Sequence, residues 1–308
     1  MKGWGILKIK KILAFFAALI GLMLSVVFVA VYISYHNPVI TEYVYRSDKL
    51  TDSFKIVAIS DLHSIQYGDN NSQLIEKIKS QYPDTIFMVG DFVNKYDESH
   101  SHVTHLVKEL SSVAPVYFSL GNHEGKYMAN HGRQIVDDVI SAGATFLDLN
   151  YSDVEIAGQN IRIGGMVDYA FALDNTNSTN PQTMKKEVYN FLCEFQNSEK
   201  LKIMLAHRPD SFVLGQASKT WDVDLIISGH THGGQVRLPF VGGLYASDQG
   251  LMPDYVYGLY KKDKVDIIIS SGLGSGFTWV PRFNNPPEIV LINFIPENQS
   301  VREEGKIK

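Results

Sequence analysis

Hydrophobic and polar positions alternate along the chain with two different periods. Short apolar runs rich in β-branched and aromatic residues occupy 55–60, 85–89 and 116–120, and this pattern is typical of buried strands. Between these runs, residues 73–79 and 104–110 carry apolar side chains at helical spacing. The strand–helix–strand order predicts an α/β sheet with crossover connections.

The second half of the chain is richer in strand-like runs. Residues 154–156 and 161–163 flank a turn at 158–160 and predict a hairpin, and residues 185–195 read as a helix. Further strands are predicted at 201–206, 223–228, 265–270 and 288–295. The polar segment 174–182 is predicted to be a surface loop.

The amino-terminal segment has a different pattern. Residues 12–35 carry no charge and follow a basic segment, 1–11, that contains four lysines. About 20 apolar residues suffice to cross a bilayer, so 12–35 is predicted to be a transmembrane signal anchor. Residues 28–30 fit a signal-cleavage site poorly, which disfavours a cleaved signal peptide. The lysines favour a cytoplasmic amino terminus, which predicts a single-pass cell-membrane protein whose carboxy-terminal domain is extracytoplasmic.

The rest of the chain divides into three segments. Residues 36–53 are mixed and polar and are interpreted as a stalk, 54–296 as one domain, and 297–308 as a tail.

Charge and cysteine content exclude some classes of partner and site. The net charge is -5 and the soluble part has no long basic run, so no nucleic-acid partner is expected. Cys193 is the only cysteine, which excludes an internal disulfide and a CxxC zinc site.

Polar residues follow five of the predicted strands. They are Asp61 and His63, Asp91, Asn122 and His123, His207, and the pair His230 and His232. Ligands of open α/β sheets bind at the carboxyl ends of strands, so these side chains are expected to meet at one site. The single-residue spacing within the first and last pairs lets both members face that site from an extended segment.

The residue types indicate a metal centre. Carboxylate, carboxamide and imidazole groups suit Mn, Fe or Zn, and the absence of thiolates argues against a structural zinc site. The candidate ligands are too many for one ion. Two divalent ions about 3.5–4 Å apart, bridged by a carboxylate, accommodate them.

Five motifs in this order resemble the calcineurin-like metallophosphoesterases. They are DLH at 61, GD at 90, GNHE at 121, the lone His207, and GHTH at 229, and the resemblance covers about 54–295. The extended GHTHGGQVRLP and the transmembrane lead resemble a bacterial membrane-anchored branch similar to UDP-2,3-diacylglucosamine hydrolases. The resemblance implies a four-layer α/β/β/α sandwich preceded by one transmembrane helix.

The resemblance also implies a role for each candidate. One metal would be held by Asp61, His63 and His232, the other by Asn122, His207 and His230, and Asp91 would bridge them together with a hydroxide. His123 is not a ligand in the family and would stabilise or protonate the leaving group. Glu124, where many relatives carry Asp, is interpreted as orienting His123.

These roles predict hydrolysis of a phosphoester or phosphoanhydride in a small molecule or a lipid. The anchor favours a lipid substrate, for example UDP-2,3-diacylglucosamine. A nucleotide-activated lipid would require a site facing the cytoplasm, in conflict with the lysine asymmetry, so both orientations stay open. The alternative is a metal-dependent binding protein that holds a phosphorylated lipid or wall polymer without cleaving it. His123 disfavours that alternative, because a binding protein needs no acid.

Other candidates have plainer interpretations. His100, His102 and His105 lie in a polar stretch and are interpreted as a solvated loop. Arg282 either anchors a rigid loop or contacts substrate. The glycine-rich segment 272–276 lacks the lysine of a P-loop and is interpreted as a lip of the site or a turn.

Overall fold

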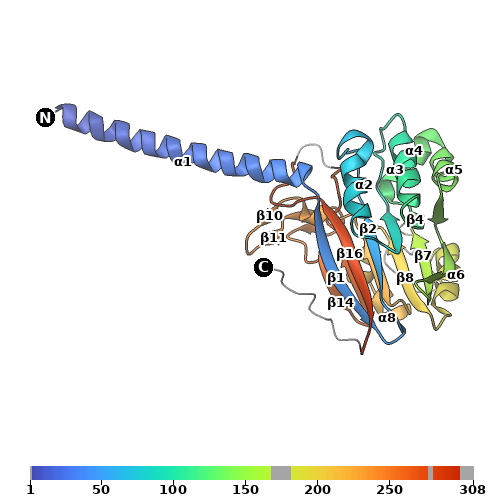
Figure 1. Cartoon of the computed structure of the whole chain (residues 1–308). Helices are drawn as coiled ribbons and strands as arrows, with labels where there is room; N and C mark the ends of the chain where they lie inside the picture. The colour runs from blue at the N-terminus through green and yellow to red at the C-terminus, as the bar shows by residue number, and fades with distance from the viewer. Residues whose placement is uncertain (1, 168–181, 277–279, 299–308) are drawn as a thin grey trace.

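The computed structural model describes residues 2–167, 182–276 and 280–298 (Figure 1). Two six-stranded sheets form the centre of the molecule. The first has the order β1 (Val39–Ser47), β16 (Glu288–Pro296), β2 (Phe54–Ile59), β3 (Thr85–Val89), β4 (Val116–Ser119) and β5 (Ala144–Leu147). The second has the order β14 (Gly258–Lys262), β15 (Val265–Ile269), β9 (Leu225–Ser228), β8 (Leu201–Ala206), β7 (Gln159–Met166) and β6 (Asn150–Ile156).

Helices cover the outer face of each sheet. On the first sheet these are α2 (Ser72–Lys79), α3 (Ser101–Ser111) and α5 (Gln134–Ser141), while α4 (Asn122–His131) follows β4. On the second sheet they are α6 (Lys186–Gln196), α7 (Asp210–Val213) and α8 (Ala217–Thr220). The order of layers is therefore α/β/β/α, which confirms the predicted sandwich.

The two-residue period of the strands explains the layers. In β2, Val57 and Ile59 pack with the helices of the first sheet, whereas Ile56 and Ala58 pack against the second sheet. Successive strand side chains point to opposite faces, so a strand apolar on both faces must be covered twice. This is why the strands read as continuous apolar runs in the sequence.

Strand direction brings the candidate residues to one edge. β2, β3 and β4 run parallel to one another, as do β8 and β9 in the other sheet. The backbone N–H of His230, after β9, donates to Asp61 Oδ1 at 3.1 Å, after β2. The carboxyl ends of both sheets therefore meet at the same place.

An apolar helix precedes the sandwich. α1 (Lys2–His36) contains the segment Ile9–His36, with a mean hydropathy of 2.8, long and apolar enough to span a bilayer. Figure 1 shows α1 projecting away from the domain, and its most apolar window has no buried residue. At its carboxyl end it contacts the domain through Ser34, which is fully buried.

Several elements differ from the sequence interpretation. The segment read as a stalk contains β1, which pairs in parallel with β16 as an edge strand; its polar residues Thr41 and Glu42 hid the strand pattern. The solvated-loop interpretation of His100, His102 and His105 is wrong, because α3 begins at Ser101. Residues 174–181 of the predicted surface loop and 299–308 of the predicted tail lie outside the described residues.

Candidate metal centre

The candidate site is built on an unusual backbone. Five candidate ligands have positive φ: Asp61 (53°), His63 (47°), Asp91 (59°), His230 (69°) and His232 (46°). Residues other than glycine seldom adopt this conformation, and local strain of this kind clusters at functional sites. These strained turns direct side chains from the ends of three strands, β2, β3 and β9, toward one point.

Two glycines allow the turns to approach each other. A Cβ at Gly121 would overlap Asp91 Oδ1, and a Cβ at Gly229 would overlap Asp61 Oδ2. Neither glycine has a positive φ. Their role is therefore to leave space for the two carboxylates rather than to permit a special backbone conformation.

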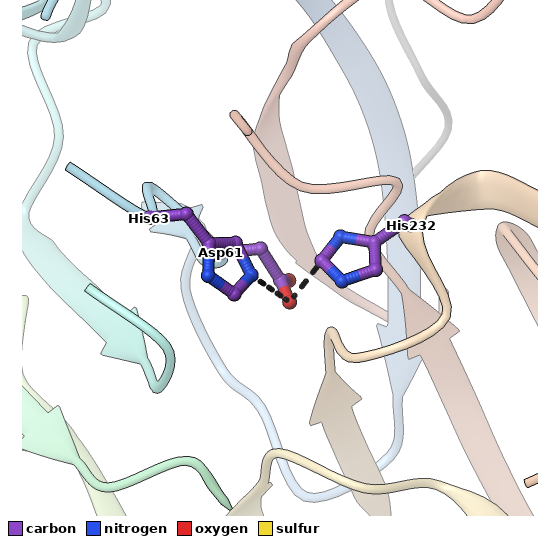
Figure 2. Close-up of side chains that lie close together, drawn as sticks. All are labelled: Asp61, His63 and His232. Atoms are coloured by element: carbon purple, nitrogen blue, oxygen red, sulfur yellow. Dashed lines mark ion pairs between the residues drawn. The ribbon is translucent and has the colours of Figure 1, made fainter. Parts of the chain in front are cut away.

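Asp61, His63 and His232 form the first group of possible ligands (Figure 2). Asp61 Oδ1 lies 3.9 Å from His63 Nε2 and 3.8 Å from His232 Nδ1. One ligand atom from each of the three lies within 4.8 Å of the others. These are the three residues that the sequence assigned to one metal.

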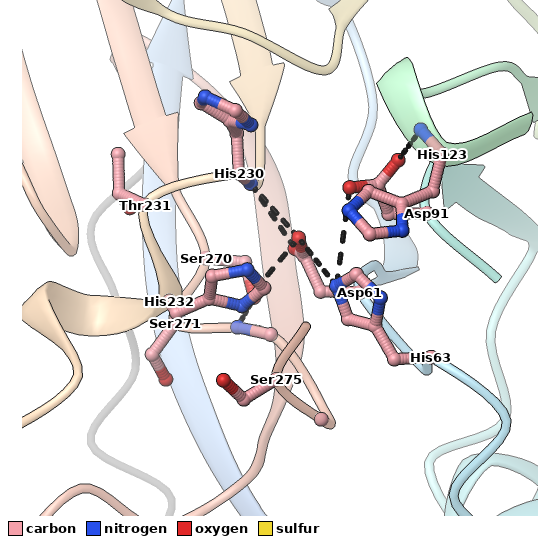
Figure 3. A network of polar contacts seen from close by, with 12 residues as sticks. Asp61, His63, Asp91, His123, His230, Thr231, His232, Ser270, Ser271 and Ser275 are labelled. Atoms are coloured by element: carbon pink, nitrogen blue, oxygen red, sulfur yellow. Dashed lines mark hydrogen bonds and ion pairs between the residues drawn. The ribbon is translucent and has the colours of Figure 1, made fainter. Parts of the chain in front are cut away.

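Asp91, His207 and His230 form a second group within the same limit. Asp91 Oδ2 lies 3.1 Å from His207 Nε2 and also 3.9 Å from His63 Nε2. Figure 3 shows Asp91 and Asp61 side by side, with the imidazoles around them. Asp91 therefore lies between both groups, as a bridging carboxylate must.

Within the described part of the chain, the buried polar atoms without a hydrogen-bond partner include two at the candidate site, His63 Nε2 and Asn122 Oδ1. Buried polar atoms are normally satisfied, so each such atom calls for an explanation. Both are ordinary metal-ligand atoms, and the donor set around them fits divalent cations.

The electrostatics of the centre follow from burial and from the two carboxylates. Burial raises the pKa of Asp61 to about 6 and lowers that of His63 to about 4. Burial also disfavours a charged His207, but the adjacent Asp91 outweighs it and raises the pKa of His207 to about 9. Without a cation, the imidazolium of His207 therefore compensates the charge of Asp91.

Second partners orient the imidazoles. His63 Nδ1 lies 3.0 Å from Asn94 Oδ1, and His207 Nδ1 lies 2.8 Å from the carbonyl oxygen of Val89. Such outer partners fix the ring and tautomer of metal-binding histidines. Asn94 was missed in the sequence because it follows the GD motif in a loop without periodic pattern.

Asp248 was missed as well. Its carboxylate lies 2.6 Å from His230 Nε2, and together with Asp210 these residues form a further group of possible ligands. Asp248 lies in the turn between the short strands β12 (Tyr245–Ala246) and β13 (Gly250–Leu251), so no nearby motif signals it.

The structure corrects the interpretation of Glu124. Its buried carboxylate accepts hydrogen bonds from the backbone N–H groups of Asp91 (2.8 Å), Phe92 (2.6 Å) and Gly121 (2.8 Å). Among the described hydrogen bonds of Glu124, none goes to the His123 ring. Glu124 therefore ties the Asp91 turn to the Asn122 turn and does not orient His123.

His123 lies at the edge of the group. Its backbone N–H donates to Asp91 Oδ1 at 2.7 Å, and its ring lies 4.7 Å from that of His63, edge to face. The side chain is half-buried, whereas His63 and Asp91 are buried. His123 is therefore placed between the buried carboxylates and solvent.

Arg282 anchors a loop. Its fully buried guanidinium donates to the carbonyl oxygens of Ser271 (2.9 Å) and Asn285 (3.0 Å) and binds Gly274 as well. This favours the loop-anchoring interpretation over substrate contact. The 272–276 segment is held beside the site in this way, and Gly272 lies against Asp61.

The fold and the site define a metallophosphoesterase. The calcineurin-like phosphoesterase family matches residues 54–234, and the chain belongs to this family. It is 29% identical to the uncharacterized metallophosphoesterase YkuE of Bacillus subtilis, over 87% of this chain and 89% of that protein. It is 26% identical to phosphodiesterase YaeI of Escherichia coli, over 79% of this chain and 82% of that protein.

Other relatives are longer or more distant. An uncharacterized metallophosphoesterase of Campylobacter jejuni is 29% identical over 85% of this chain, and the chain spans 66% of its length. Among solved structures, a dimetal phosphatase of Danio rerio is 13% identical, with a TM-score of 0.41, over 72% of this chain and 88% of that one.

Membership in the family determines the class of reaction. The chain is a dinuclear, metal-dependent phosphoesterase, and its His and Asp groups fit that requirement. The metal identity, the ligand assignment and the relation to UDP-2,3-diacylglucosamine hydrolases stay predictions.

Proposed function

We propose that this protein is a membrane-anchored phosphohydrolase that acts on a lipid-linked phosphoester or phosphoanhydride. The family supports the hydrolytic class, and the apolar helix α1 supports the anchor. We place the catalytic domain outside the cytoplasm, because lysines precede α1's apolar segment. If the catalytic domain instead faces the cytoplasm, a UDP-2,3-diacylglucosamine-like substrate is the alternative that we propose, since a nucleotide-activated lipid faces the cytoplasm.

The ligand assignment rests on the position of Asp91 between two groups of possible ligands. Asp61, His63 and His232 would hold one cation, and Asn122, His207 and His230 the other, with Asp91 shared. When bound, two such cations lower the pKa of water and neutralise charge on a phosphate. The candidate ligand side chains keep fixed positions around the cations, because strained turns and buried partners hold them in place.

His123 is proposed to protonate the leaving oxygen. It is the half-buried imidazole beside Asp91 and His63, so it can reach both the substrate and solvent. Burial lowers the pKa of His123, and Asp91 acts in the opposite direction. A bound phosphate anion would add to the effect of Asp91 and favour the protonated ring that an acid requires.

Hydrolysis is tested with the full-length protein in detergent, with added Mn²⁺ and nitrophenyl phosphate mono- and diesters. Asp91→Ala and His230→Ala should abolish turnover while the fold is retained, as judged by circular dichroism. Asp254→Ala, at an exposed carboxylate, is the control. Near-normal turnover of both site variants would defeat the ligand assignment, and a parent that binds phosphate esters without product release would favour the binding-protein alternative.

The lipid and topology parts need their own measurements. Extracted membrane lipids, offered to the parent protein, should release a soluble phosphorylated product. In intact cells, an externally added protease should reach the carboxy-terminal domain before the membrane is permeabilised. Cleavage only after permeabilisation would overturn the extracytoplasmic placement and favour a nucleotide-activated substrate.

A further inference from the structure

Two small hairpins beside the site expose large apolar side chains. One joins β10 (Arg237–Leu238) to β11 (Gly242–Gly243), and the other joins β12 to β13. We call their exposed apolar residues the apolar lip: Leu238, Phe240, Val241, Leu251 and Met252. Single exposed apolar residues are common, but a group of five on two adjoining hairpins is the kind of patch that marks an interaction surface.

Phe240 lies at the tip of the first hairpin. The Val241 N–H donates to the Leu238 carbonyl at 3.2 Å, which closes a turn with Pro239 and Phe240 at its centre. Phe240 has a φ of 66° at the turn position that glycine or asparagine usually occupies, and its side chain is fully exposed. Across the lip, Leu251 is 80% exposed.

The lip is tied to the end of α1. The backbone N–H groups of Asn285 and Arg282 donate to Ser34 Oγ and to the Tyr35 hydroxyl, each at 3.0 Å. In the same loop, the Phe283 carbonyl accepts from the Arg237 N–H at 3.0 Å, at the start of the first hairpin. Figure 1 shows β10 and β11 on the side of the domain from which α1 projects.

This attachment determines where a bilayer would lie. Tyr32 and Tyr35 lie at the end of the apolar segment, and tyrosines are enriched at the interface of a membrane span. Arg237 is hydrogen-bonded to the loop that contacts Tyr35, and Phe240 is three residues further along the chain. Three extended residues span roughly 10 Å, so Phe240 lies within about that distance of the loop. Interfacial apolar groups enter a bilayer by about 5–10 Å, so the tip is within reach.

An apolar cavity continues from the lip toward the site. It has a volume of about 300 Å³ and is lined by Gly234, Gln235, Val236, Leu244, Leu251 and other residues. Gly234 and Gln235 lie two and three residues after the proposed ligand His232, while Leu251 belongs to the lip. The apolar lip and the metal centre are therefore neighbours.

We propose that the apolar lip inserts into the membrane interface that α1 crosses, and so docks the metal centre against lipid headgroups. The partner is the bilayer surface itself. This inference rests on the proposed membrane anchoring and is independent of the proposed chemistry. A single flexible anchor would leave the domain free to tilt, whereas the anchor and lip together give two points of attachment.

Insertion is tested by labelling, because Cys193 is the only cysteine. In a Cys193→Ser background, Phe240→Cys is labelled with an environment-sensitive fluorophore, and the full-length protein is reconstituted into equimolar phosphatidylethanolamine and phosphatidylglycerol vesicles. Tyr82→Cys is the matched control: Tyr82 is also an exposed aromatic with positive φ (51°). It precedes β3, at the opposite ends of the strands from the site.

The label at position 240 should show a blue-shifted emission and lose intensity when the vesicles contain lipids brominated near the headgroup. The label at position 82 should show neither change. Equal, water-like emission at both positions would overturn the proposal. A blue shift at 240 without bromine quenching would also overturn it, because the label would then contact protein, for example a second copy. Vesicle flotation tests the membrane anchor separately. A protein that does not float with the vesicles would overturn the proposal, because the proposal rests on that anchor.

Substitution of the lip gives a second measurement. Phe240→Asp should reduce hydrolysis of a phosphate ester embedded in vesicles and leave hydrolysis of a soluble nitrophenyl ester unchanged, whereas Tyr82→Asp should affect neither. Equal rates on the embedded ester would count against the lip. A parent inactive on the soluble ester would instead refute the proposed function, while the fluorescence result would still decide the docking.

Discussion

The Asp248 carboxylate lies 2.6 Å from His230 Nε2 and 3.2 Å from a guanidinium nitrogen of Arg208. Burial raises the pKa of Asp248, but the His230 hydrogen bond and the charge of Arg208 outweigh it, so the pKa lies below its usual value. Asp248 is thus a stable carboxylate that holds His230 by one ring nitrogen and leaves the other for a metal. Outer partners of this kind typically contribute 10–100-fold to metal affinity or activity.

Asp248→Asn should therefore weaken binding of one of the two cations by about 10–100-fold, because the amide holds the His230 ring less firmly. Metal content after dialysis and turnover at increasing Mn²⁺ measure this. Excess metal should restore turnover, which a defect in folding would not allow. Asp254→Asn, an exposed neighbour, is the control. Unchanged metal affinity in Asp248→Asn would show that His230 needs no such support.

His123→Ala tests the proposed acid apart from the ligands. Loss of a general acid typically costs about 10²–10⁴-fold in rate, so turnover of an alkyl phosphate ester, whose leaving oxygen needs a proton, should fall within that range. The fall should be smaller for esters with better leaving groups, because these need less protonation. Metal content should stay at two ions. A variant that instead loses a cation would make His123 a ligand, in line with its place in the group with His63 and Asp91.

The pKa of His207 predicts proton release on metal binding. In the absence of a cation, Asp91 raises this pKa to about 9, so His207 is protonated at neutral pH. Metal binding requires a neutral imidazole, and one proton must leave. Apparent metal affinity should thus fall about tenfold per pH unit as the pH falls below about 9, where a tenfold change equals about 1.4 kcal/mol.

Below about pH 6 the fall should steepen, because the pKa of Asp61 is also raised and its carboxylate then takes up a proton. Calorimetric titration in buffers of different ionisation enthalpy counts the protons released. His63 contributes none in this range, since its pKa is lowered to about 4. A pH-independent affinity between pH 7 and 9 would contradict the pairing of His207 with Asp91.

The sequence identified most residues of the candidate site because the strands are buried on both faces. Continuous apolar runs such as 85–89 show where a strand ends, and the polar residue that follows must lie at the sheet edge. Asp61, Asp91 and His207 were found by this argument. The order of motifs then related them to a family, which the comparison supports.

The missed features have no periodic signal. β1 is an edge strand with alternating exposure, and its partner β16 lies at the far end of the chain. Asp248 and Asn94 lie in loops and gain their role only when the fold brings them to His230 and His63. The role of Glu124 was misjudged because its partners are backbone groups, which the sequence does not distinguish.

Gly121 offers the sharpest test of how closely the site is packed. Its φ of -112° is open to any residue, so only space limits substitution. A Cβ there would lie 2.6 Å from the Asp91 backbone nitrogen and would overlap Asp91 Oδ1. Overpacking of this kind costs about 1–3 kcal/mol, and here it would push Asp91 from its position between the two ligand groups.

Gly121→Ala should therefore lower the thermal midpoint and remove at least one cation together with most of the turnover. Gly125→Ala is the matched control, because Gly125 lies in α4 only four residues away and has no atom within 4 Å of the added Cβ. In a helix this change is neutral to stabilising, by up to about 1 kcal/mol. If Gly121→Ala kept two cations and parental turnover, the turns at 91 and 121 would have room for an added Cβ. The position of Asp91 would then not depend on close packing between these turns.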